Sequence, residues 1–382
     1  MTKPVTILHV RNSIAYGGVE TSMLGWLNNV DRSRFNCPVA LFTERNDAEA
    51  AFRNTFRAHG HRVISVPWHP GRQFRKAVAT LEQHIHETDA KLLHTHDWRS
   101  DVIGWHAARR AGIPIMTTIY VWFRHPLATR IKEAIDSFYI RKFDRVTAVC
   151  KATLCQTVDR GVAKEKTEVL ISGMDPSRTI NKMDREIIRA RFGLTNAHIA
   201  FVYVARFYRE KAHATLIEAF REVVARHPQV RLLLLGKGPL EKALHEQIAA
   251  AGLTEQVLMP GFVEDVPTVL TAMDIMVHAS LAEGIPLALY EGMLAGLPTI
   301  GSDVDGNPEV VIPQHTGWLV PPGNMKALRN ALFDALQQKD LWETYGDNAR
   351  SLIMSEYSIS HAVTRLQTCW QKIIQHNMEP TA

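Results

Sequence analysis

Short apolar runs alternate with longer amphipathic stretches along most of the chain. Many of the runs are rich in β-branched residues, which predicts strands in the first half at residues 5–10, 37–42, 63–66, 91–96, 113–119 and 145–149. The same pattern predicts strands in the second half at residues 198–205, 231–235, 257–260 and 273–278. The intervening stretches have helical periodicity, as at residues 20–30, 72–86, 214–226 and 240–251. This alternation is typical of parallel sheets with helices on both faces, and it predicts an α/β protein.

The length of the chain predicts more than one domain. At 382 residues it exceeds the roughly 250–300 residues at which a single hydrophobic core stops growing. The strand and helix pattern begins again after residue 176, behind a glycine-containing loop around Gly173 that suits a hinge. We therefore expect two doubly wound, Rossmann-like domains, one at residues 1–175 and one at residues 176–357.

Composition and charge exclude several classes of protein. Charged residues make up 22% of the chain and hydrophobic residues 46%, which is typical of an ordinary globular protein. The net charge of +5 is mildly basic and lacks the concentrated stripe expected of a nucleic-acid binder. The start has no secretory signal pattern, and no apolar run approaches the ~20 residues that span a bilayer. These features predict a cytoplasmic protein that binds no nucleic acid.

Residues 282–300 form the most informative stretch. Glu283 is followed by Gly284, Ile285, Pro286 and Leu287, which predicts a tight loop that opens a helix, with proline in the first turn. The free backbone N–H groups of a helix N-terminus bind anions such as phosphate. A second carboxylate, Glu291, lies further along the same helix. One glutamate beside a phosphate site and another beyond it suit a sugar attached to a nucleoside diphosphate.

Other candidate residues follow the ends of predicted strands, where doubly wound sheets bind their ligands. Arg206 and Lys211 lie in the loop after the strand at 198–205, and two cations there could clamp a diphosphate. Gly17 and Gly18 lie between the first strand and its helix. His94 and His96 alternate at the end of the strand at 91–96 and point to one face. A metal site would need further ligands that the sequence does not place.

These motifs resemble the donor-binding signature of the retaining glycosyltransferases of GT-B architecture, in the large group called family four. The two glutamates are separated by seven residues, and the helix ends in Gly296-Leu297-Pro298, as in that family. The resemblance extends from Gly17 to about Tyr357. It implies transfer of a hexose-type sugar from a nucleotide diphosphate donor to an acceptor hydroxyl with retention of configuration.

The resemblance also assigns roles to residues. It implies that Glu291 holds the ribose, that Glu283 and His96 hold the transferred sugar, and that Arg206 and Lys211 stabilise the leaving diphosphate. Further donor contacts are implied for Gly17, Gly18, Gly236, Val263, Gly284, Ile285, Pro286 and Leu287. No cofactor or metal is expected, because the cations and the helix N-terminus supply the charge. The final stretch, residues 358–382, is expected to be a helix that crosses back to the first domain.

The chain departs from the family pattern at three positions. Ala212 stands where the family usually has glycine, and Ser172 and Met174 replace the common asparagine and aliphatic residue in the loop that ends the first domain. Asp303-Val304-Asp305 could be taken for the metal-binding motif of another glycosyltransferase class. The residues that follow it continue the family-four pattern instead, so we interpret this Asp-x-Asp as a loop without a metal role.

The acceptor is less defined by the sequence. The resemblance implies a glycan or a lipid-linked acceptor in cell-surface polysaccharide or glycoconjugate biosynthesis. Residues 122–142 mix aromatic and aliphatic side chains with arginine and lysine, a combination that either lies on a membrane or belongs to an ordinary surface helix. One interpretation is therefore that the protein makes a peripheral contact with the anionic inner face of the cell membrane.

Two alternatives to a glycosyltransferase remain at this point. Sugar-nucleotide epimerases and sugar phosphorylases share the two-domain architecture, although the stretch at 282–300 argues against both. A non-catalytic binding subunit with the same fold is the other alternative. Loss of Arg206, Lys211 or Glu291 would favour it, and the chain keeps all three.

Overall fold

The structure is a computed structural model. It describes residues 3–12, 17–43, 47–68, 73–122, 127–176, 183–284 and 287–378. Ile285 and Pro286, which the sequence analysis assigns to the donor site, lie outside the described residues. No helix within these ranges is long and apolar enough to cross a bilayer.

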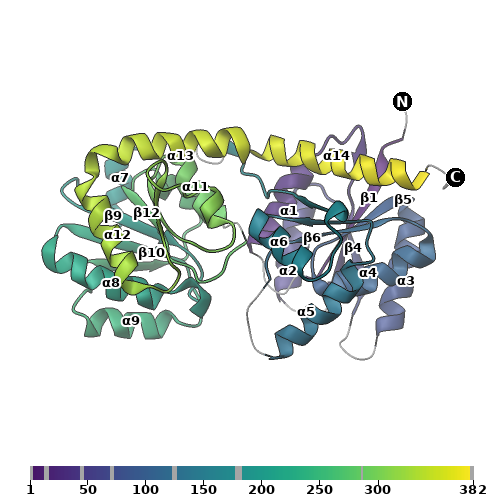
Figure 1. The fold of residues 1–382 in the computed structure, drawn as a ribbon, viewed down its shortest axis with the longest axis horizontal. Helices are drawn as coiled ribbons and strands as arrows, with labels where there is room; N and C mark the ends of the chain where they lie inside the picture. The colour runs from purple at the N-terminus through teal and green to yellow at the C-terminus, as the bar shows by residue number, and fades with distance from the viewer. Residues whose placement is uncertain are drawn as a thin grey trace. The chain divides into compact units, whose positions relative to one another are not determined.

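The chain divides into two compact units. The first contains Met1–Gly173 together with Ile359–Ala382, and the second contains Met174–Ser358. The boundaries given by the sequence analysis, after residues 175 and 357, lie next to these. Each unit has a parallel sheet of its own, and we describe the two separately (Figure 1).

The sheet of the first unit is parallel throughout its described strands, with the order β4-β3-β1-β5-β6-β7-β8 and β2 paired to β1. Its strands are β1 (Val5–Arg11), β2 (Phe35–Asn36), β3 (Val39–Thr43), β4 (Val63–Pro67), β5 (Ala90–Thr95), β6 (Ile115–Ile119), β7 (Arg145–Ala148) and β8 (Thr167–Val169). The chain order reverses direction across the sheet between β1 and β5. In doubly wound folds, ligands bind at the carboxyl ends of the two strands that flank this switch point.

Helices cover both faces of this sheet (Figure 1). They are α1 (Gly18–Asn29), α2 (Asp47–Ala58), α3 (Phe74–Thr88), α4 (Trp98–Ala111), α5 (Leu127–Ile140), α6 (Lys151–Asp159) and α14 (Ile359–Met378). Helix α14, yellow in Figure 1, packs into the first unit through the side chain of Trp370, which is fully buried. The Trp370 ring packs edge-on against His9 and Phe35, so the C-terminal helix completes the core of the N-terminal unit.

The second unit has a parallel sheet with the order β11-β10-β9-β12-β13-β14. Its strands are β9 (Ile199–Val204), β10 (Val230–Leu235), β11 (Val257–Gly261), β12 (Ile275–His278), β13 (Thr299–Ser302) and β14 (Gly317–Val320). Its helices are α7 (Arg185–Ala190), α8 (His213–Arg226), α9 (Glu241–Ala250), α10 (Val266–Leu270), α11 (Leu287–Leu294), α12 (Met325–Gln337) and α13 (Trp342–Glu356). The strand order is that of a Rossmann sheet, and its switch point lies between β9 and β12.

The strands of both sheets are buried and mainly apolar, as expected of strands covered on both faces. In the second unit, Phe201, Leu232 and Ile275 come from neighbouring strands and are completely buried against Phe220 of α8. The two parallel sheets agree with the expected fold class, which is two Rossmann-like domains.

A pair of carboxyl groups is buried between α4 and α5 of the first unit. Asp101 on α4 accepts a hydrogen bond from the Thr95 hydroxyl, and its carboxyl group interacts with that of Asp136 on α5. Burial, the largest cause, raises the pKa of both groups, and the charge of Asp101 raises the pKa of Asp136 further. We therefore expect the pair to retain a proton at a pH at which unpaired carboxyl groups have lost theirs.

This pair predicts a pH-dependent stability. A carboxyl pKa raised in the folded state means that stabilising free energy is lost as the pH rises from the unfolded value near 4 toward the raised pKa. Asp136→Asn keeps a hydrogen-bonding group and removes the charge. Between about pH 5 and about pH 8 the wild type should therefore lose stability that the variant keeps, and the Tm of the variant should rise relative to that of the wild type. Thermal unfolding followed by circular dichroism measures it, with the exposed Asp159→Asn as control. A difference that does not change with pH would contradict the shared proton.

Candidate functional site

Backbone hydrogen bonds tie together the loops that follow the carboxyl ends of β9, β12 and β13 in the second unit. The loops after β9 and β12, at the switch point, are joined by the Leu281 N–H, which donates to the Glu210 carbonyl at 2.7 Å. The loops after β12 and β13 are joined by the Gly306 N–H, which donates to the Gly284 carbonyl at 3.2 Å. The loop that carries Lys211 and the loop that carries Glu283 are thus held in one fixed arrangement.

The loops after β9 and β10 approach each other so closely that two positions require glycine. A Cβ atom on Gly236 would lie 2.1 Å from the carbonyl oxygen of Ala205, and one on Gly238 would lie 2.5 Å from that of Phe207. Gly236 also donates its N–H to the carbonyl of Gly261, at the end of β11. The glycines of the G-K-G-P motif therefore allow the loop that carries Arg206 to lie directly against its neighbour.

The carboxylate of Glu283 lies at the centre of this edge. Its Oε1 atom accepts hydrogen bonds from Ser280 Oγ at 2.7 Å, from His278 Nε2 at 3.0 Å and from the ammonium group of Lys211. Tyr203 supports the arrangement, because its hydroxyl donates to the Lys211 carbonyl at 2.9 Å and lies 2.9 Å from Ser280 Oγ. No described residue donates to Oε2 of Glu283. That oxygen is available to a ligand hydroxyl.

The electrostatics keep Glu283 charged. Burial alone would raise the pKa of this carboxyl group, but the charge of Lys211 and the hydrogen bond from His278 outweigh it and lower the pKa to about 2. The carboxylate is therefore a permanent acceptor in the physiological pH range. Its stabilising contribution is present above the unfolded pKa near 4.5 and is lost as the pH falls toward 2.

Asp305 is a functional residue that the sequence analysis did not identify. Its Oδ2 atom accepts the backbone N–H of Glu283 at 2.8 Å, and its backbone has a positive φ of 42°. The sequence interpretation treated Asp303-Val304-Asp305 as a loop without a metal role and assigned it no other contact. In the structure the second aspartate positions the Glu283 loop, and no local pattern in the sequence could reveal a contact between residues 22 apart.

The cations of this edge differ in their surroundings. Lys211 is largely buried beside Glu283, whereas Arg206 is exposed, with its guanidinium 5.0 Å from the ring centre of Tyr208. No described residue forms a hydrogen bond or ion pair with the Arg206 guanidinium. Ala212, where the family usually has glycine, adopts the left-handed conformation with φ of 50°, which explains the family preference.

Three further predicted contacts lie on the same edge. Glu291 and Leu287 belong to α11, and both are half-buried. Val263 follows the end of β11, next to Phe262, whose side chain is 66% exposed. The structure thus brings Arg206, Lys211, Gly236, Val263, Glu283, Gly284, Leu287 and Glu291 to the carboxyl edge of one sheet. Their roles toward a ligand stay predictions.

The corresponding edge of the first unit contains Arg11 at the end of β1. Its guanidinium donates to Glu20 Oε1 at 3.0 Å and 3.1 Å and to the His96 carbonyl at 2.7 Å. Glu20 in turn accepts the N–H of Gly17 at 3.0 Å. Arg11 and Glu20, which the sequence analysis did not select, therefore hold the Gly17-Gly18 turn against the end of β5.

Three histidines meet beneath this edge. His9, His94 and His96 are all buried, and each offers a ring nitrogen within 4.8 Å of the others. Burial, the largest cause, lowers the pKa of all three, so they are neutral near pH 7. His9 is a third member of the set that the sequence analysis could not place, because it comes from a strand 85 residues earlier than His94.

The hydrogen bonds of His94 argue against a metal ion there. The Thr147 hydroxyl donates to the Thr117 carbonyl, so the Thr118 hydroxyl donates to Thr147 and must accept from His94 Nε2 at 2.8 Å. His94 Nδ1 then accepts from the Trp370 indole at 3.4 Å. Both ring nitrogens of His94 are thus committed to protein partners.

His96 is held in the same way. Its Nδ1 atom lies 3.2 Å from the Tyr120 hydroxyl, and its Nε2 atom lies 2.9 Å from His9 Nδ1. These contacts orient the ring at the end of β5. The prediction that His96 reaches a transferred sugar stays a prediction.

Two sequence families match the chain on either side of the boundary between the units. Glycosyltransferase Family 4 matches residues 16–178, and Glycosyl transferases group 1 matches residues 184–352. The chain belongs to the family-four glycosyltransferases of GT-B architecture. The family confirms the prediction, made from the sequence resemblance, that the protein is an enzyme of the glycosyltransferase class.

Individual relatives agree with the family. The chain is 25% identical over 305 residues to the Escherichia coli UDP-Gal:alpha-D-GlcNAc-diphosphoundecaprenol alpha-1,3-galactosyltransferase, which covers 76% of this chain and 78% of the relative. It is 24% identical over 238 residues, 62% of each chain, to the N-acetyl-alpha-D-glucosaminyl L-malate synthase of Bacillus anthracis. The crystal structure of HepE from Anabaena in complex with UDP shares the fold, with a TM-score of 0.86, 22% identity and coverage of 96% of this chain and 100% of HepE.

The buried pair of Lys211 and Glu283 predicts a strong coupling. Lys211→Met leaves the Glu283 carboxylate buried without its cation, which should cost about 3 kcal/mol of unfolding free energy. Glu283→Gln added to that variant should restore most of the loss, because the uncompensated charge is removed. Urea denaturation followed by tryptophan fluorescence measures the cycle, with the exposed Lys242→Met as control. Additive single and double effects would show that the two groups do not interact.

Proposed function

We propose that this glycosyltransferase moves a hexose-type sugar from a uridine diphosphate donor to an acceptor hydroxyl with retention of configuration. The single observation that carries the proposal is the Glu283 carboxylate beside the Lys211 cation. Its Oε1 atom accepts three hydrogen bonds from the protein, and no described residue donates to its Oε2 atom. HepE, which shares the fold, has been crystallised with UDP, with UDP-glucose and with UDP and glucose. The name of the Escherichia coli relative also contains a UDP-sugar.

In this proposal the second unit binds the donor. The β-phosphate gathers negative charge as the glycosidic bond breaks, and Arg206, Lys211 and the N-terminus of α11 stabilise that charge. The unpaired guanidinium of Arg206 is suited to a bidentate contact with phosphate oxygens. Because these groups supply positive charge, we propose that the reaction requires no metal ion and no cofactor.

The two glutamates divide the recognition of the donor. Oε2 of Glu283 accepts a hydroxyl of the transferred sugar, while Glu291, further along α11, accepts hydroxyls of the ribose. The turn from Gly261 to Val263 lies beside the base, with exposed Phe262 available for stacking. Since Glu283 stays ionised far below neutral pH, sugar binding through it should not titrate in the physiological range.

The first unit contributes the acceptor side, with His96 and the Gly17-Gly18 turn held by Arg11 and Glu20. For the chemical step, we propose front-face attack. In that route the acceptor hydroxyl bonds to the anomeric carbon as the bond to the diphosphate breaks, and the leaving phosphate oxygen takes the hydroxyl proton. The step then needs no carboxylate nucleophile from the first unit.

The ribose assignment predicts the behaviour of Glu291→Ala. Loss of the carboxylate leaves the ribose hydroxyls without a partner, so the Kd for UDP should weaken by at least about tenfold. Isothermal titration calorimetry measures it, and Glu255→Ala, at an exposed position of the same unit, is the control. Unchanged affinity in Glu291→Ala would contradict the assignment.

The acceptor is proposed to be a glycan or a lipid-linked saccharide, which brings the first unit to an anionic membrane from the cytoplasmic side. Helix α5 supports this part. Ile131, Ile135 and Phe138 lie at i, i+4 and i+7 on one helix face, with 55%, 41% and 54% of their surface exposed. Cationic side chains flank that face, and Lys142 Nζ lies 3.7 Å from the Phe138 ring centre. An apolar face with adjacent cations is typical of helices that lie in a membrane interface.

The membrane contact predicts the outcome of liposome flotation. Replacing Ile131, Ile135 and Phe138 with glutamine removes the apolar face and should reduce the fraction bound to anionic liposomes at least about fivefold. The matched control is Ile187→Gln with Met354→Gln, two comparably exposed apolar residues of the second unit. Wild-type protein that remains entirely unbound would contradict the proposed contact.

A further inference from the structure

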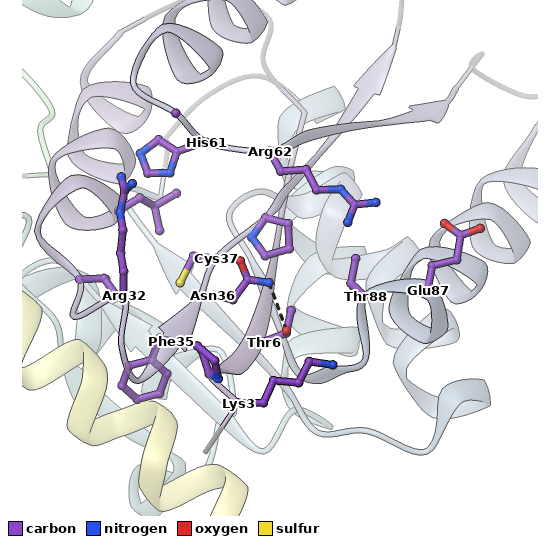
Figure 2. Close-up of a pocket in the computed structure, with 15 residues that line it drawn as sticks. Lys3, Thr6, Arg32, Phe35, Asn36, Cys37, His61, Arg62, Glu87 and Thr88 are labelled. Atoms are coloured by element: carbon purple, nitrogen blue, oxygen red, sulfur yellow. Dashed lines mark hydrogen bonds between the residues drawn. The ribbon is translucent and has the colours of Figure 1, made fainter. Parts of the chain in front are cut away.

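A hollow of about 450 Å³ opens in the first unit, at the edge of the sheet where β1, β3 and β5 begin (Figure 2). Its walls come from residues beside the start of β1, from the segment at 32–38 and from the end of α3. Strand β5 has six residues at about 3.3 Å each, so the hollow lies roughly 20 Å from His96 at the opposite edge. It is therefore separate from the proposed acceptor side of the same unit.

Three cations surround the hollow. Arg32 lies on one side beside His61, and Lys3 and Arg62 reach toward the other side, near Thr88 (Figure 2). Among the described residues, none forms a hydrogen bond or an ion pair with the guanidinium group of Arg32 or of Arg62. Lys3 has only a long contact of 3.8 Å with Asp89, and its side chain is 77% exposed. The three cations outnumber the one carboxylate of the lining, Glu87, whose pKa is also lowered by the charge of Arg62.

The one carboxylate in the lining belongs to Glu87, and it is hydrogen-bonded to other side chains of α3. Glu87 accepts hydrogen bonds from Gln83 at 2.6 Å and from His84 at 3.0 Å, and these bonds are the largest causes of its lowered pKa. The inner wall is neutral. Burial, followed by the charge of Arg32, lowers the pKa of His61 to about 4, and burial raises the pKa of the Cys37 thiol to about 12.

The interior offers both polar and apolar contacts. Asn36 Nδ2 donates to Thr6 Oγ1 at 3.3 Å, while Leu27 and Phe35 form a buried apolar floor. A volume of 450 Å³ is within the range of about 300–1,000 Å³ that holds small molecules. Guanidinium groups on opposite sides suit a ligand with more than one anionic oxygen, since each can bind two oxygens in parallel.

We propose that this hollow is a second binding site, distinct from the donor edge, for a small phosphorylated molecule whose phosphate groups are held by Arg32, Arg62 and Lys3. The site depends only on residues of the first unit. It would exist whether or not the proposed transfer of a uridine-linked sugar is correct.

Calorimetric titration with sodium pyrophosphate at low salt tests this site. The double variant Arg32→Gln/Arg62→Gln should bind pyrophosphate at least about tenfold more weakly at one site than the wild type. The control, Arg57→Gln/Arg75→Gln, removes the same charge from exposed positions of the same unit and should match the wild type. Pyrophosphate could also bind at the donor edge of the second unit. Neither double variant changes that edge, so any binding there contributes equally to the two isotherms. Equal isotherms for the two double variants would overturn the proposal.

Cysteine protection gives a second measurement on unaltered protein. Cys37 lines the hollow, and Cys155 is exposed on α6 away from it. Burial raises the pKa of Cys37, so the reaction with a maleimide is run at alkaline pH and for long enough that Cys37 is measurably alkylated without pyrophosphate. Under these conditions pyrophosphate should slow alkylation of Cys37 while leaving Cys155 unaffected, as quantified by peptide mass spectrometry. Equal rates at Cys37 with and without pyrophosphate would refute occupation of the hollow, even if the arginine variants fail to fold. Both measurements use pyrophosphate and residues of the first unit. If the protein failed to bind UDP, the proposed function would fail, but these two measurements would still test the hollow.

Discussion

The second unit depends on one buried anion, the carboxylate of Glu283. A charge taken out of water is costly unless it is paired and hydrogen-bonded, and here three donors converge on a single oxygen. Those donors come from β12, from the loop that follows it and from the loop after β9. Satisfying the carboxylate therefore fixes two loops at once, and the backbone bond from Glu283 to Asp305 adds the loop after β13.

The same constraint explains how the edge can perform chemistry. A carboxylate whose Oε1 is saturated presents Oε2 in a defined direction, which is the pre-organisation that sugar recognition requires. The neighbouring lysine is held by the same contact, and the arginine has no hydrogen bond or ion pair within the described ranges, so both cations are suited to the diphosphate of the proposed donor. In the first unit, Arg11 plays a comparable role, because it binds Glu20 and the His96 carbonyl together.

Local patterns in the sequence were sufficient for the fold class and for the loops at the carboxyl edges of both sheets. Alternating strands and helices predict doubly wound sheets, and residues after strands such as Arg206 and Glu283 are then expected at one edge. The supporting partners could not be predicted. Asp305 binds Glu283 across 22 residues, and His9 meets His94 and His96 only because β1 and β5 are neighbours in the sheet. Such contacts depend on strand order, which hydrophobic periodicity does not encode. Ala212 is an intermediate case, since the family preference for glycine indicated an unusual backbone and the positive φ explains it.

The most direct test of the account is a thermal-shift series with the purified protein and UDP, GDP, ADP and CMP, each measured with and without EDTA. A ligand that binds only the folded state raises the Tm, and the rise grows with the logarithm of the ligand concentration relative to the Kd. The account predicts a clear stabilisation by UDP that EDTA leaves unchanged and that exceeds the effect of the other nucleotides. The absence of any stabilisation by a nucleoside diphosphate, or a UDP shift abolished by EDTA, would contradict a metal-independent donor site built from Arg206, Lys211 and Glu283.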